Sequence, residues 1–522
     1  MTVVRTHLIR QEYRDSVQLM RAASTANKLE GVEIASVLMG TPKNKSLLEE
    51  VNLLTSEALN AGPNDIIISV QAETETSGTI AIQYIIDFLS QEVMSPTNGV
   101  TTYRSIRGAL SGLVNANLAV ISVPGEFAAR EARLALEQNL NVFLFSDNVS
   151  IEDEVALKSY AHEKGLIIMG PDCGTGMIKN IGLGFANVVL PGPIGIVAAS
   201  GTGTQEVMVL CHHRGVGVTH AIGTGSRDIK DIVGGISMID GIHELDRDPS
   251  IKLIIVISKP PDDLTLQKIL TEIQHCSKPV IINFLGKKAG YFDIPQKTLT
   301  VETLEEAALS ASQYIQSKEL QRIPVVFDDE LKIKYLLTEA KSRLTSKQKY
   351  IRGLFAGGTF TYEAALIISN ILPSSDSVWT NVRLKETKLI RNPKKSEEHT
   401  LIDMGADEFT VGKPHPMIDQ TERIIRFLEE INDPETAVIL IDFITGFSAH
   451  ENPIANMRDA FSKWKAQTRR VPIVTHICGT ELDPQDIKEI KSELRELGVY
   501  IMPTNAQAAR LAALIATRGE II

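Results

Sequence analysis

Two stretches of this chain carry the same junction, an apolar run that enters a glycine-rich turn and then a helix-favouring segment. The first reads GPIGIVAASGTGTQE and the second GLFAGGTFTYE; aligned on Ser200 and Gly357, they share the pattern small-Gly-Thr-x-Thr-x-Glu. In both halves an Asp-Pro turn before a strand follows, at Asp248 and Asp433, and then a strand preceded by proline, in SKPVIINFLG and RRVPIVTHICG. Three matched landmarks in the same order indicate an internal duplication. The landmarks are farther apart in the second copy, which therefore carries an insertion.

Apolar runs of four to eight residues alternate with helix-period segments along most of the chain, for example NLAVISVP, NVFLFSD, IKLIIVIS and AVILIDFI. Runs that are apolar on both faces and separated by helices are typical of parallel sheets covered on both sides. The sequence therefore predicts an α/β protein, and its 522 residues are too many for one hydrophobic core. We expect several doubly wound modules.

Turn-rich segments suggest where these modules begin and end. MSPTNGV ends a small N-terminal α/β domain, and PGPIG separates a second module from a third. The charged stretch DDELKIKYLLTEAKSRLTSKQKY is typical of a connector. The predicted divisions are residues 1–97, 98–190, 191–325, the connector 326–350, and 351–522.

Composition excludes several classes of protein. No window is apolar over the roughly 18 to 20 residues that a membrane helix needs, and the N-terminus lacks a secretory signal. The four cysteines are scattered without any CxxC, which argues for a reducing compartment and against a zinc site. A net charge of −11 disfavours nucleic acid as a partner. We expect a cytoplasmic protein that contacts neither nucleic acid nor membrane.

Each glycine-rich corner is suited to bind an anion. A helix N-terminus presents free N–H groups and about half a positive charge, which favours a phosphate or a carboxylate. The alternative is structural, because serine and threonine are ordinary N-caps and glycines permit tight packing. The presence of two copies favours the binding role, since facing helix ends could hold one anion between them. The predicted phosphate-binding residues are Ser200, Gly201, Thr202 and Thr204 in the first corner, Gly357, Gly358, Thr359 and Thr361 in the second, and Gly225.

Two cationic residues near the first copy are candidate catalytic groups. Arg227, in GTGSRDIKD, follows a glycine-rich turn and could clamp phosphate or an α-keto carboxylate in a bidentate manner. The alternative is a surface ion pair with Asp228 or Asp231. Lys259, in SKPP, comes at the end of a strand, where ligands of open α/β sheets bind.

The insertion in the second copy offers two more candidates. Lys413 and His415 lie in KPHP, a rigid extended stretch because each proline biases the preceding residue away from helix. His415 is a candidate general acid/base; a solvated loop is the alternative. Acidic residues nearby could suggest Mg²⁺, but their spacing is not diagnostic of a metal, and no metal site is predicted. These residues are Asp403, Asp407, Glu408 and Asp419.

Three other residues are expected to be structural. His450 and His476 each follow or end a strand-like run, as many ordinary histidines do. Cys173, in GPDCGTG, has no visible charge partner that would lower its pKa, so we expect a buried small residue and not a nucleophile.

These segments resemble a known family. The stretch from NLAVISVPGEF to GPDCGTGMI looks like the CoA-binding domain of the succinyl-CoA synthetase α subunit, and GPIGIVAASGTGTQE with GVTHAIGTGSRDI resembles its ligase module. GLFAGGTFTYEAA resembles a corresponding helix of the β subunit. With LIDMGADEFTVGKPHPMID included, the chain is similar over nearly its full length to the FdrA family, which fuses these modules. The resemblance implies a CoA-binding-like Rossmann domain followed by two flavodoxin-like ligase-type domains.

The sequence departs from the synthetases at their catalytic centre. They carry a phosphohistidine in a Gly-His-Ala-Gly segment after the strand equivalent to IINFLG, where this chain reads KKAGYFDIPQ. The turn that supplies the carboxylate for that histidine reads SKPP here. A phosphohistidine relay is therefore not expected, and no ATP-grasp domain is recognisable. Nor does a GxGxxG turn occur near residues 65–105, so CoA binding is implied only by the resemblance.

The FdrA family is associated with oxamate carbamoyltransferase activity in anaerobic allantoin breakdown, a branch of purine catabolism, together with two companion proteins. The resemblance thus implies phosphate, carbamoyl phosphate, oxamate and oxalurate as ligands, companion subunits, and a homo-oligomer. An anion site at the corners suits that reaction, because N–H donors and cations stabilise the charge that develops on the attacked carbonyl oxygen. An acyl-CoA synthetase and a non-catalytic scaffold subunit are the alternatives.

Overall fold

The computed structural model describes residues 2–12, 14, 16–94, 101–288, 294–374, 377–410, 413–468 and 470–519. The chain divides into two compact units: Met1–Ala109 with Asp407–His415, and Leu110–Ala406 with Pro416–Ile522. The predicted boundary between residues 97 and 98 lies outside the described residues.

The N-terminal unit is built on a three-stranded antiparallel sheet, with β3 (Ile66–Ala72) between β1 (Val3–Ile9) and β2 (Val32–Met39). Helices α1 (Ser16–Ala26) and α4 (Glu75–Met94) pack on the sheet and on each other. The short helices α2 (Pro42–Glu50) and α3 (Ser56–Leu59) lie beside β2 and β1. Apolar side chains of β3 enter two separate core clusters, which explains why both faces of this strand carry apolar residues. Helix α14 (Asp407–Thr410) falls within the segment that joins this unit.

The larger unit begins with a small parallel sheet of order β4-β5-β6. The strands are β4 (Leu118–Ile121), β5 (Asn141–Leu144) and β6 (Ile168–Met169). The preceding helix is α5 (Ile106–Gly112), and α6 (Gly125–Glu137) and α7 (Ile151–Lys164) connect the strands. Ser150 caps α7, and Gly165 ends it in the left-handed conformation.

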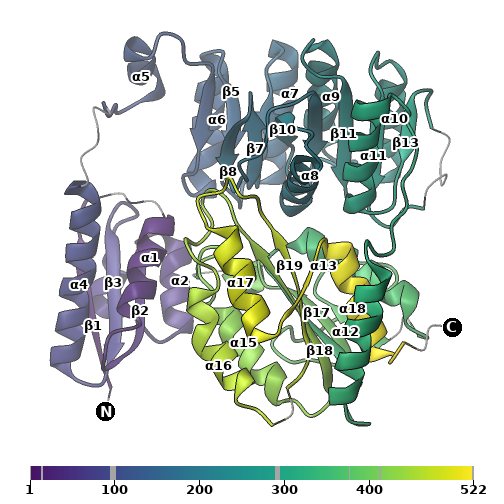
Figure 1. Cartoon of the computed structure of the whole chain (residues 1–522). Helices are drawn as coiled ribbons and strands as arrows, with labels where there is room; N and C mark the ends of the chain where they lie inside the picture. Colours follow the sequence, from purple (N-terminus) through teal and green to yellow (C-terminus); the bar gives the residue numbers. More distant parts are fainter. Residues whose placement is uncertain are drawn as a thin grey trace. The chain divides into compact units, whose positions relative to one another are not determined.

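A seven-stranded sheet follows, in which five parallel strands are extended by a hairpin. The spatial order is β13 (Thr298–Thr300), β12 (Val280–Phe284), β11 (Leu253–Ser258), β9 (Ile194–Ala198), β10 (Val218–Gly223), β7 (Thr175–Ile178) and β8 (Ile181–Gly184). Helices α8 (Gly201–His213) and α11 (Leu304–Ser317) cover one face, and α9 (Ile236–Arg247) and α10 (Asp263–Gln274) the other (Figure 1). The hairpin β7–β8 precedes the predicted division at residue 190 but pairs with β10, because its backbone completes this sheet's open edge.

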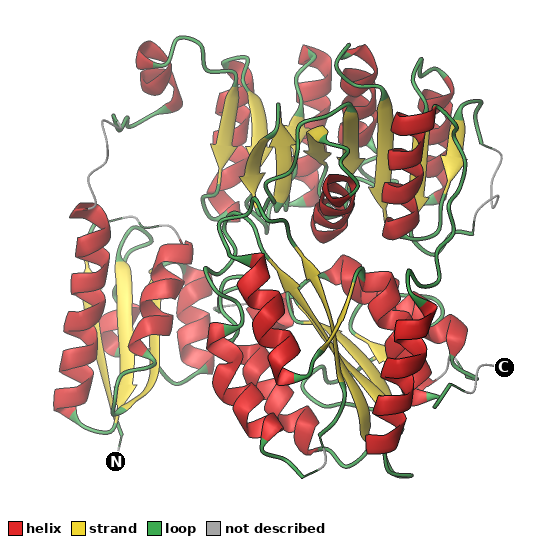
Figure 2. Cartoon of the chain, viewed as in Figure 1, coloured by secondary structure: helices red, strands yellow, loops and turns green. Residues whose placement is uncertain are grey.

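The second seven-stranded sheet is parallel throughout. Its order is β16 (Lys388–Leu389), β15 (Val378–Thr380), β17 (His399–Asp403), β14 (Tyr350–Phe355), β18 (Thr436–Ile444), β19 (Ile473–Cys478) and β20 (Tyr500–Met502). Helices α12 (Glu330–Arg343), α13 (Gly358–Ile371) and α18 (Asn505–Ala516) lie on one face; α15 (Thr421–Asn432), α16 (Arg458–Lys465), α17 (Ile487–Leu497) and the short η2 (Ala455–Met457) belong to the other side (Figures 1 and 2). All nine residues of the central strand β18 are buried, as expected for a strand covered on both faces.

The two larger sheets repeat one topology. The order β13-β12-β11-β9-β10 in the first matches β20-β19-β18-β14-β17 in the second. The strand that leads into the corner is β9 in the first sheet and β14 in the second. β9 lies between β11, which follows the Asp-Pro turn, and β10; β14 lies in the same way between β18 and β17. The extra strands β15 and β16 fall in the longer interval of the second copy. The predicted α/β fold with parallel sheets is confirmed.

In the part of the chain that the structure describes, no helix is both long enough and apolar enough to span a membrane.

Candidate functional site

The first corner forms just after β9, where Ser200 caps α8. Ser200 is extended, and its Oγ accepts a hydrogen bond from the Gly203 amide at 3.2 Å. The Thr204 hydroxyl donates back to the Ser200 carbonyl at 2.6 Å, a common bond of threonine in a first helical turn. The Thr204 hydrogen is therefore used within the helix. A Cβ on Gly201 would meet Thr175 Oγ1 at 3.3 Å, so this backbone packs closely on β7.

The second corner repeats this geometry with a glycine cap. Gly357 is extended after β14, and within the described structure no side chain makes a cap hydrogen bond to α13. The Thr361 hydroxyl donates to the Gly357 carbonyl at 3.1 Å, as Thr204 does in the first copy. Helix α13 thus presents its first-turn amides, including those of Gly358 and Thr359, without a side-chain cap. With the helix dipole, these amides form an anion-binding end.

The two corners lie against each other. Ser200 Oγ and Thr359 Oγ1 are 2.8 Å apart and share a hydrogen bond. A Cβ on Gly357 would lie 2.4 Å from Thr202 Cγ2, and one on Gly203 would lie 3.1 Å from Thr359 Cγ2. Each corner therefore carries a glycine where the threonine of the other corner needs room. The sequence did not show whether the two corners face each other; in the structure they are in direct contact.

Thr202 adds a buried polar atom to this junction. Its side chain is 8% exposed, and among the described residues its Oγ1 has no hydrogen-bond partner. The hydroxyl of Ser258, at the end of β11, is also buried without a partner there. The Ala199 amide donates to the Ile257 carbonyl, which places the end of β11 beside the first corner. Buried hydroxyls in native proteins are usually hydrogen-bonded, so these two indicate a site that a ligand completes.

Lys259, which follows β11, and Asp403, which ends β17 in the other sheet, flank the second corner. A Cβ on Gly358 would lie 2.6 Å from Asp403 Oδ2 and 4.0 Å from Lys259 Nζ. The Lys259 ammonium also lies 5.5 Å from the centre of the Tyr362 ring, in the first turns of α13. Burial lowers the pKa of Lys259 below its ordinary value, and the negative charge of Asp403 opposes that shift. The site therefore combines a desolvated cation, a carboxylate and two helix N-termini.

Arg227 and Gly225 support the junction of two sheets. Arg227 forms an ion pair with Glu154 at 2.8 Å and donates to the Val149 carbonyl at 2.9 Å. Arg227 is thus held by Glu154 of α7 and by Val149, which precedes the helix cap Ser150. The ion pair is therefore not the one with Asp228 or Asp231 that the sequence left as the alternative. Gly225 has φ +78°, and a Cβ there would lie 2.2 Å from the Pro171 carbonyl oxygen. Only glycine fits this close approach.

Lys413 and His415 belong to the segment Asp407–His415, which groups with the N-terminal unit. The paired corners belong to the other unit. Gly412, in the same KPHP-containing stretch, lies outside the described residues. The catalytic roles of Lys413 and His415 stay predictions.

The glutamate that ends each corner motif has a role that the sequence reasoning missed. Glu363, from the second copy, accepts a hydrogen bond at 2.9 Å from the Leu304 amide, which begins α11 in the first copy. Glu206, from the first copy, accepts one at 3.3 Å from the Asn505 amide, which begins α18 in the second. Each copy thus caps the last helix of the other. The signal was present in the sequence, because the glutamate occurs at the same place in both motifs.

Glu206 also joins His476 and Cys478 in the one group of described residues that could hold a metal ion, with ligand atoms within 4.8 Å of one another. His476 Nε2 lies 2.6 Å from the Glu206 carboxylate. Burial lowers the pKa of His476, but Glu206 outweighs that effect and the pKa is raised overall. Burial raises the pKa of the Cys478 thiol well above its usual value, which disfavours the thiolate that a metal needs. A buried ion pair accounts for this group.

His450 and Cys173 have structural surroundings. The His450 ring bonds to the Asn452 amide and to the Asn456 side chain, both at 3.0 Å. Burial raises the pKa of the Cys173 thiol to about 12, so it is not a nucleophile at neutral pH.

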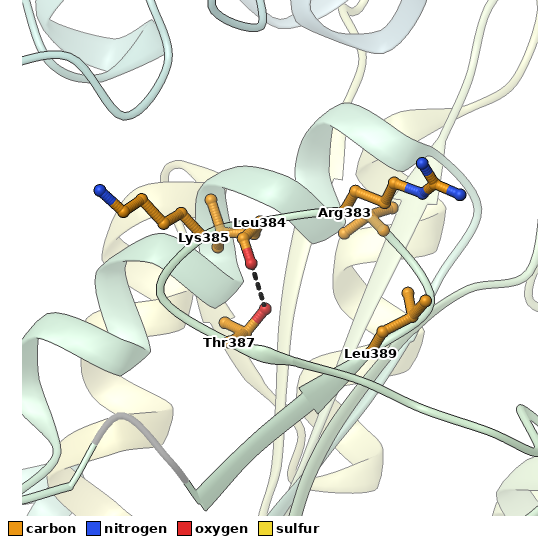
Figure 3. A pocket seen from close by; sticks show the side chains of 6 residues that line it. Arg383, Leu384, Lys385, Thr387 and Leu389 are labelled. Atoms are coloured by element: carbon orange, nitrogen blue, oxygen red, sulfur yellow. Dashed lines mark hydrogen bonds between the residues drawn. The ribbon is translucent and has the colours of Figure 1, made fainter.

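A cavity of about 300 Å³ opens in the loop between β15 and β16 (Figure 3). The Thr387 hydroxyl donates to the Leu384 carbonyl at 3.3 Å across this loop. Figure 3 shows the charged ends of Arg383 and Lys385 projecting to opposite sides. The two cations do not converge on one ligand, and the paired corners remain the better candidate site.

Comparisons with known proteins found two matching family models and several relatives. A family model described as CoA-ligase matches residues 354–515, and one described as AllF, heavy metal-associated domain, matches residues 1–103. The uncharacterized protein YahF of Escherichia coli strain K12 is 40% identical, over 97% of this chain and 98% of its own. The α subunit of succinate–CoA ligase from Staphylococcus epidermidis is 26% identical, over 42% of this chain and 74% of its own. Among solved structures, the dinucleotide-forming acetyl-coenzyme A synthetase 1 of Ca. Korarchaeum cryptofilum, in complex with phosphate and ADP, is 16% identical with a TM-score of 0.31, covering 80% of this chain and 85% of its own.

The domain matched by the heavy metal-associated model lacks thiolate ligands in this chain. Residues 1–103 contain no cysteine and a single histidine, His7. His7 is exposed on β1, opposite Ile68 of β3. Soft metals are selected by thiolate and thioether ligands. The donor set of this domain therefore does not fit a thiolate metal centre.

Proposed function

This chain belongs to the FdrA/AllF-like family of succinyl-CoA-synthetase-related proteins that includes YahF, and we propose that it is a subunit of a carbamoyltransferase. It binds phosphate and carbamoyl phosphate where its two helix N-termini meet. The proposed reaction takes oxalurate and phosphate to oxamate and carbamoyl phosphate. The carbamoyl substrate comes from the family resemblance; the anion site comes from the residues.

The contact between the two corners is the observation that carries this proposal. Ser200 and Thr359 share a hydrogen bond across the duplicated modules, and Thr202 buries an unpaired hydroxyl beside them. Helices α8 and α13 both begin at this contact. First-turn amides of helices bind phosphate oxygens without further charge, and two helix ends give a dianion more donors than one.

The chemistry follows from that position. A phosphate oxygen attacks the carbamoyl carbon, the carbon–nitrogen bond to the oxamate portion breaks, and the departing nitrogen takes a proton. The Lys259 ammonium stabilises the charge that develops on the carbamoyl oxygen. The attacking phosphate supplies that proton from its O–H group. Catalytic roles for Lys413 and His415, which group with the N-terminal unit, stay predictions.

The absence of a histidine between residues 276 and 398 supports direct attack over a phosphohistidine relay. Part of the segment KKAGYFDIPQ, where the synthetases place that histidine, lies outside the described residues. Mg²⁺ and CoA stay possible ligands that no residue pattern of this chain supports.

A thermal-shift titration of the purified chain with phosphate, carbamoyl phosphate, oxamate and CoA, each alone, tests the proposal. Saturation at about 100 times Kd adds roughly 2.7 kcal/mol of stability. We expect carbamoyl phosphate to raise Tm, and the double variant Thr202→Val, Thr359→Val to abolish both this shift and phosphate-dependent turnover while the unliganded protein stays folded. Unchanged binding and turnover in the double variant would contradict the proposal.

An acyl-CoA synthetase is the second candidate, favoured by the match to a succinate–CoA ligase α subunit over 42% of the chain. Stabilisation by CoA and not by carbamoyl phosphate would support it. An unchanged Tm with all four ligands would favour a non-catalytic scaffold subunit.

Companion subunits, a homo-oligomeric state and a cytoplasmic location belong to the same proposal. Turnover that requires added companion proteins, while ligand binding does not, would fit a binding subunit of a larger enzyme.

A further inference from the structure

A second cavity, of about 330 Å³, lies within the larger unit, and no corner residue is among the described residues that line it. Its wall is formed by the end of α8 and the start of α11 from the first copy, by β19, α17, β20 and the turn that follows from the second, and by the start of α12. Ligand pockets commonly have volumes of about 300–1,000 Å³. This cavity therefore has room for a compact organic ligand.

The charges on the cavity wall are opposite in sign to those of the chain as a whole. The chain carries a net charge of −11, yet lysine and arginine outnumber carboxylates among the described lining residues. The cations are Arg214, Lys332, Lys491 and Arg495, and the carboxylates are Glu305 and Asp328. Within the described structure, none of the four cationic side chains forms a hydrogen bond or an ion pair. The wall thus favours an anionic ligand.

Lys491 is the most informative of these cations. It is partly buried and lies one helical turn before Arg495 on α17, where like charges repel. Burial lowers the pKa of Lys491, Arg495 lowers it further, and Glu481 opposes the shift. The pKa of His213, at the end of α8, is lowered by burial and by Lys491. Lys491 therefore bears both desolvation and repulsion without a close counter-ion, and an anion in the cavity would offset both.

Other parts of the wall suit a ligand that is more than an anion. Ile477 of β19 and Met502 of β20 are buried side chains that line the cavity, and their strands are neighbours in the sheet. They give an apolar surface on which a flat ring can pack. The exposed Asp328 can accept hydrogen bonds from hydroxyl groups, as acidic residues do from ribose in dinucleotide-binding folds. A nucleoside phosphate carries a flat ring, ribose hydroxyls and an anionic end.

We propose that this cavity is a nucleotide-binding site, in which Lys491 and Arg495 bind the phosphates of a nucleoside diphosphate and Asp328 accepts a hydrogen bond from its ribose. Free ADP and the nucleotide part of CoA share this chemistry. The inference is independent of the proposed function, because the paired corners do not line the cavity.

Calorimetric titration of the full-length chain with ADP, CoA, adenosine and pyrophosphate, each alone, tests the inference. We expect ADP to bind at least roughly 10-fold more tightly than adenosine or pyrophosphate, because each of these lacks part of the complementary groups. Tighter binding of ADP than of CoA identifies a free nucleotide as the ligand, and the reverse identifies CoA. In Lys491→Met the affinity for ADP falls roughly 10-fold. Lys488→Met, which removes an exposed cation of α17 that does not line the cavity, is the control and keeps the wild-type affinity.

Two results would overturn the inference without touching the proposed function. One is a wild-type chain that does not bind ADP; the other is an ADP affinity that is equal in Lys491→Met and the wild type. The corner variant Thr202→Val, Thr359→Val is expected to bind ADP as the wild type does. Loss of ADP binding in that variant, with retention in Lys491→Met, would place the phosphates at the corners and contradict this site.

The unliganded variants separate a binding role from a structural one. Lys491→Met is expected to be at least as stable as the wild type in denaturant, because it removes a desolvated charge beside Arg495. A marked loss of stability would show that Lys491 serves the fold and would count against the inference. Arg495→Met, at an exposed position, is a second variant with the same expected loss of ADP affinity, and an unchanged affinity there contradicts the proposal as well.

Discussion

Thr202 and Gly357 show how residues of the two copies are fitted to one another. The threonine methyl of one corner fills the space above the glycine of the other, and a serine–threonine hydrogen bond closes the contact. Glycine is required at position 357 by this neighbour, since its φ of −145° suits any residue. The residue types at the corner are therefore explained jointly by anion binding and by packing between the copies.

Gly357→Ala tests the packing requirement. The added Cβ would lie 2.4 Å from Thr202 Cγ2, and overpacking of this kind costs about 1–3 kcal/mol. We expect a lower free energy of unfolding by chemical denaturation and weaker phosphate binding, because the helix ends move apart. In Gly174→Ala the new Cβ has its nearest neighbour at 3.7 Å, so this control is expected to match the wild type. Equal stability of both variants would show that the corners are not in tight contact.

At the scale of secondary-structure elements, the reciprocal glutamates link helices of different copies. Glu363 lies in α13 and bonds to the starts of α11 and α18, through the Leu304 amide and the Asn505 side chain. Glu206 lies in α8 and bonds to the start of α18 through the Asn505 amide. Burial raises the pKa of the Glu363 carboxyl to about 6, yet this carboxyl accepts hydrogen bonds from two buried donors, the Leu304 amide and the Asn505 side chain.

Hydrogen exchange distinguishes this crossed arrangement from local capping. Glu363→Ala removes the acceptor of the Leu304 amide, so we expect faster exchange at the start of α11, which belongs to the other copy. The loss of a buried acceptor costs about 1–3 kcal/mol for each donor left unpaired. Glu496→Ala, at an exposed position of α17, is the control. Faster exchange confined to α13 would contradict the crossed capping.

At the scale of the larger unit, the duplicated modules pack as an internal pseudo-symmetric pair. In a symmetric dimer the same surface patch of each subunit forms the interface. Here the equivalent motifs of the two modules in one chain form the contact in the same way. Helices α11 and α18 meet through Glu305, whose carboxylate accepts a hydrogen bond at 2.5 Å from the Gln507 side chain. Burial raises the pKa of Glu305 to about 7, against the opposing effects of Gln507 and Arg510.

The raised pKa of Glu305 predicts a pH-dependent stability. A carboxyl whose pKa is higher in the folded protein than in the unfolded chain binds a proton on folding. Its stabilising contribution is complete below the unfolded value of 4.5 and is lost as the pH rises through about 7. We expect Glu305→Gln, which stays neutral, to be more stable than the wild type at pH 8, by an amount on the order of 2 kcal/mol, and to equal it near pH 4.

Denaturant titrations between pH 4 and pH 8 measure this difference. Glu319→Gln, at an exposed position after α11, is the control for the charge change. A constant difference between Glu305→Gln and the wild type across this range would contradict the prediction.

The sequence by itself determined the fold class, the duplication and the presence of an insertion. Strands such as AVILIDFI are apolar on both faces because both faces are covered, and this local pattern is visible without any knowledge of partners. The corner motif likewise carries its own signal, since strand, glycine turn and helix are contiguous. The repeated glutamate is part of that motif. The backbone amide to which it bonds, at the start of a helix in the other copy, is not part of the motif.

Only the tertiary structure decided which of these residues meet. Ser200 and Thr359 are brought together by packing between two modules with different sheets, and Arg227 pairs with Glu154 on helix α7 of a third. Lys259 and Asp403 come from strands of different copies, and periodicity along a chain contains no information on such pairs. The physical reason is that secondary structure follows from local side-chain patterns, whereas the site is made by contacts between elements that are distant in sequence.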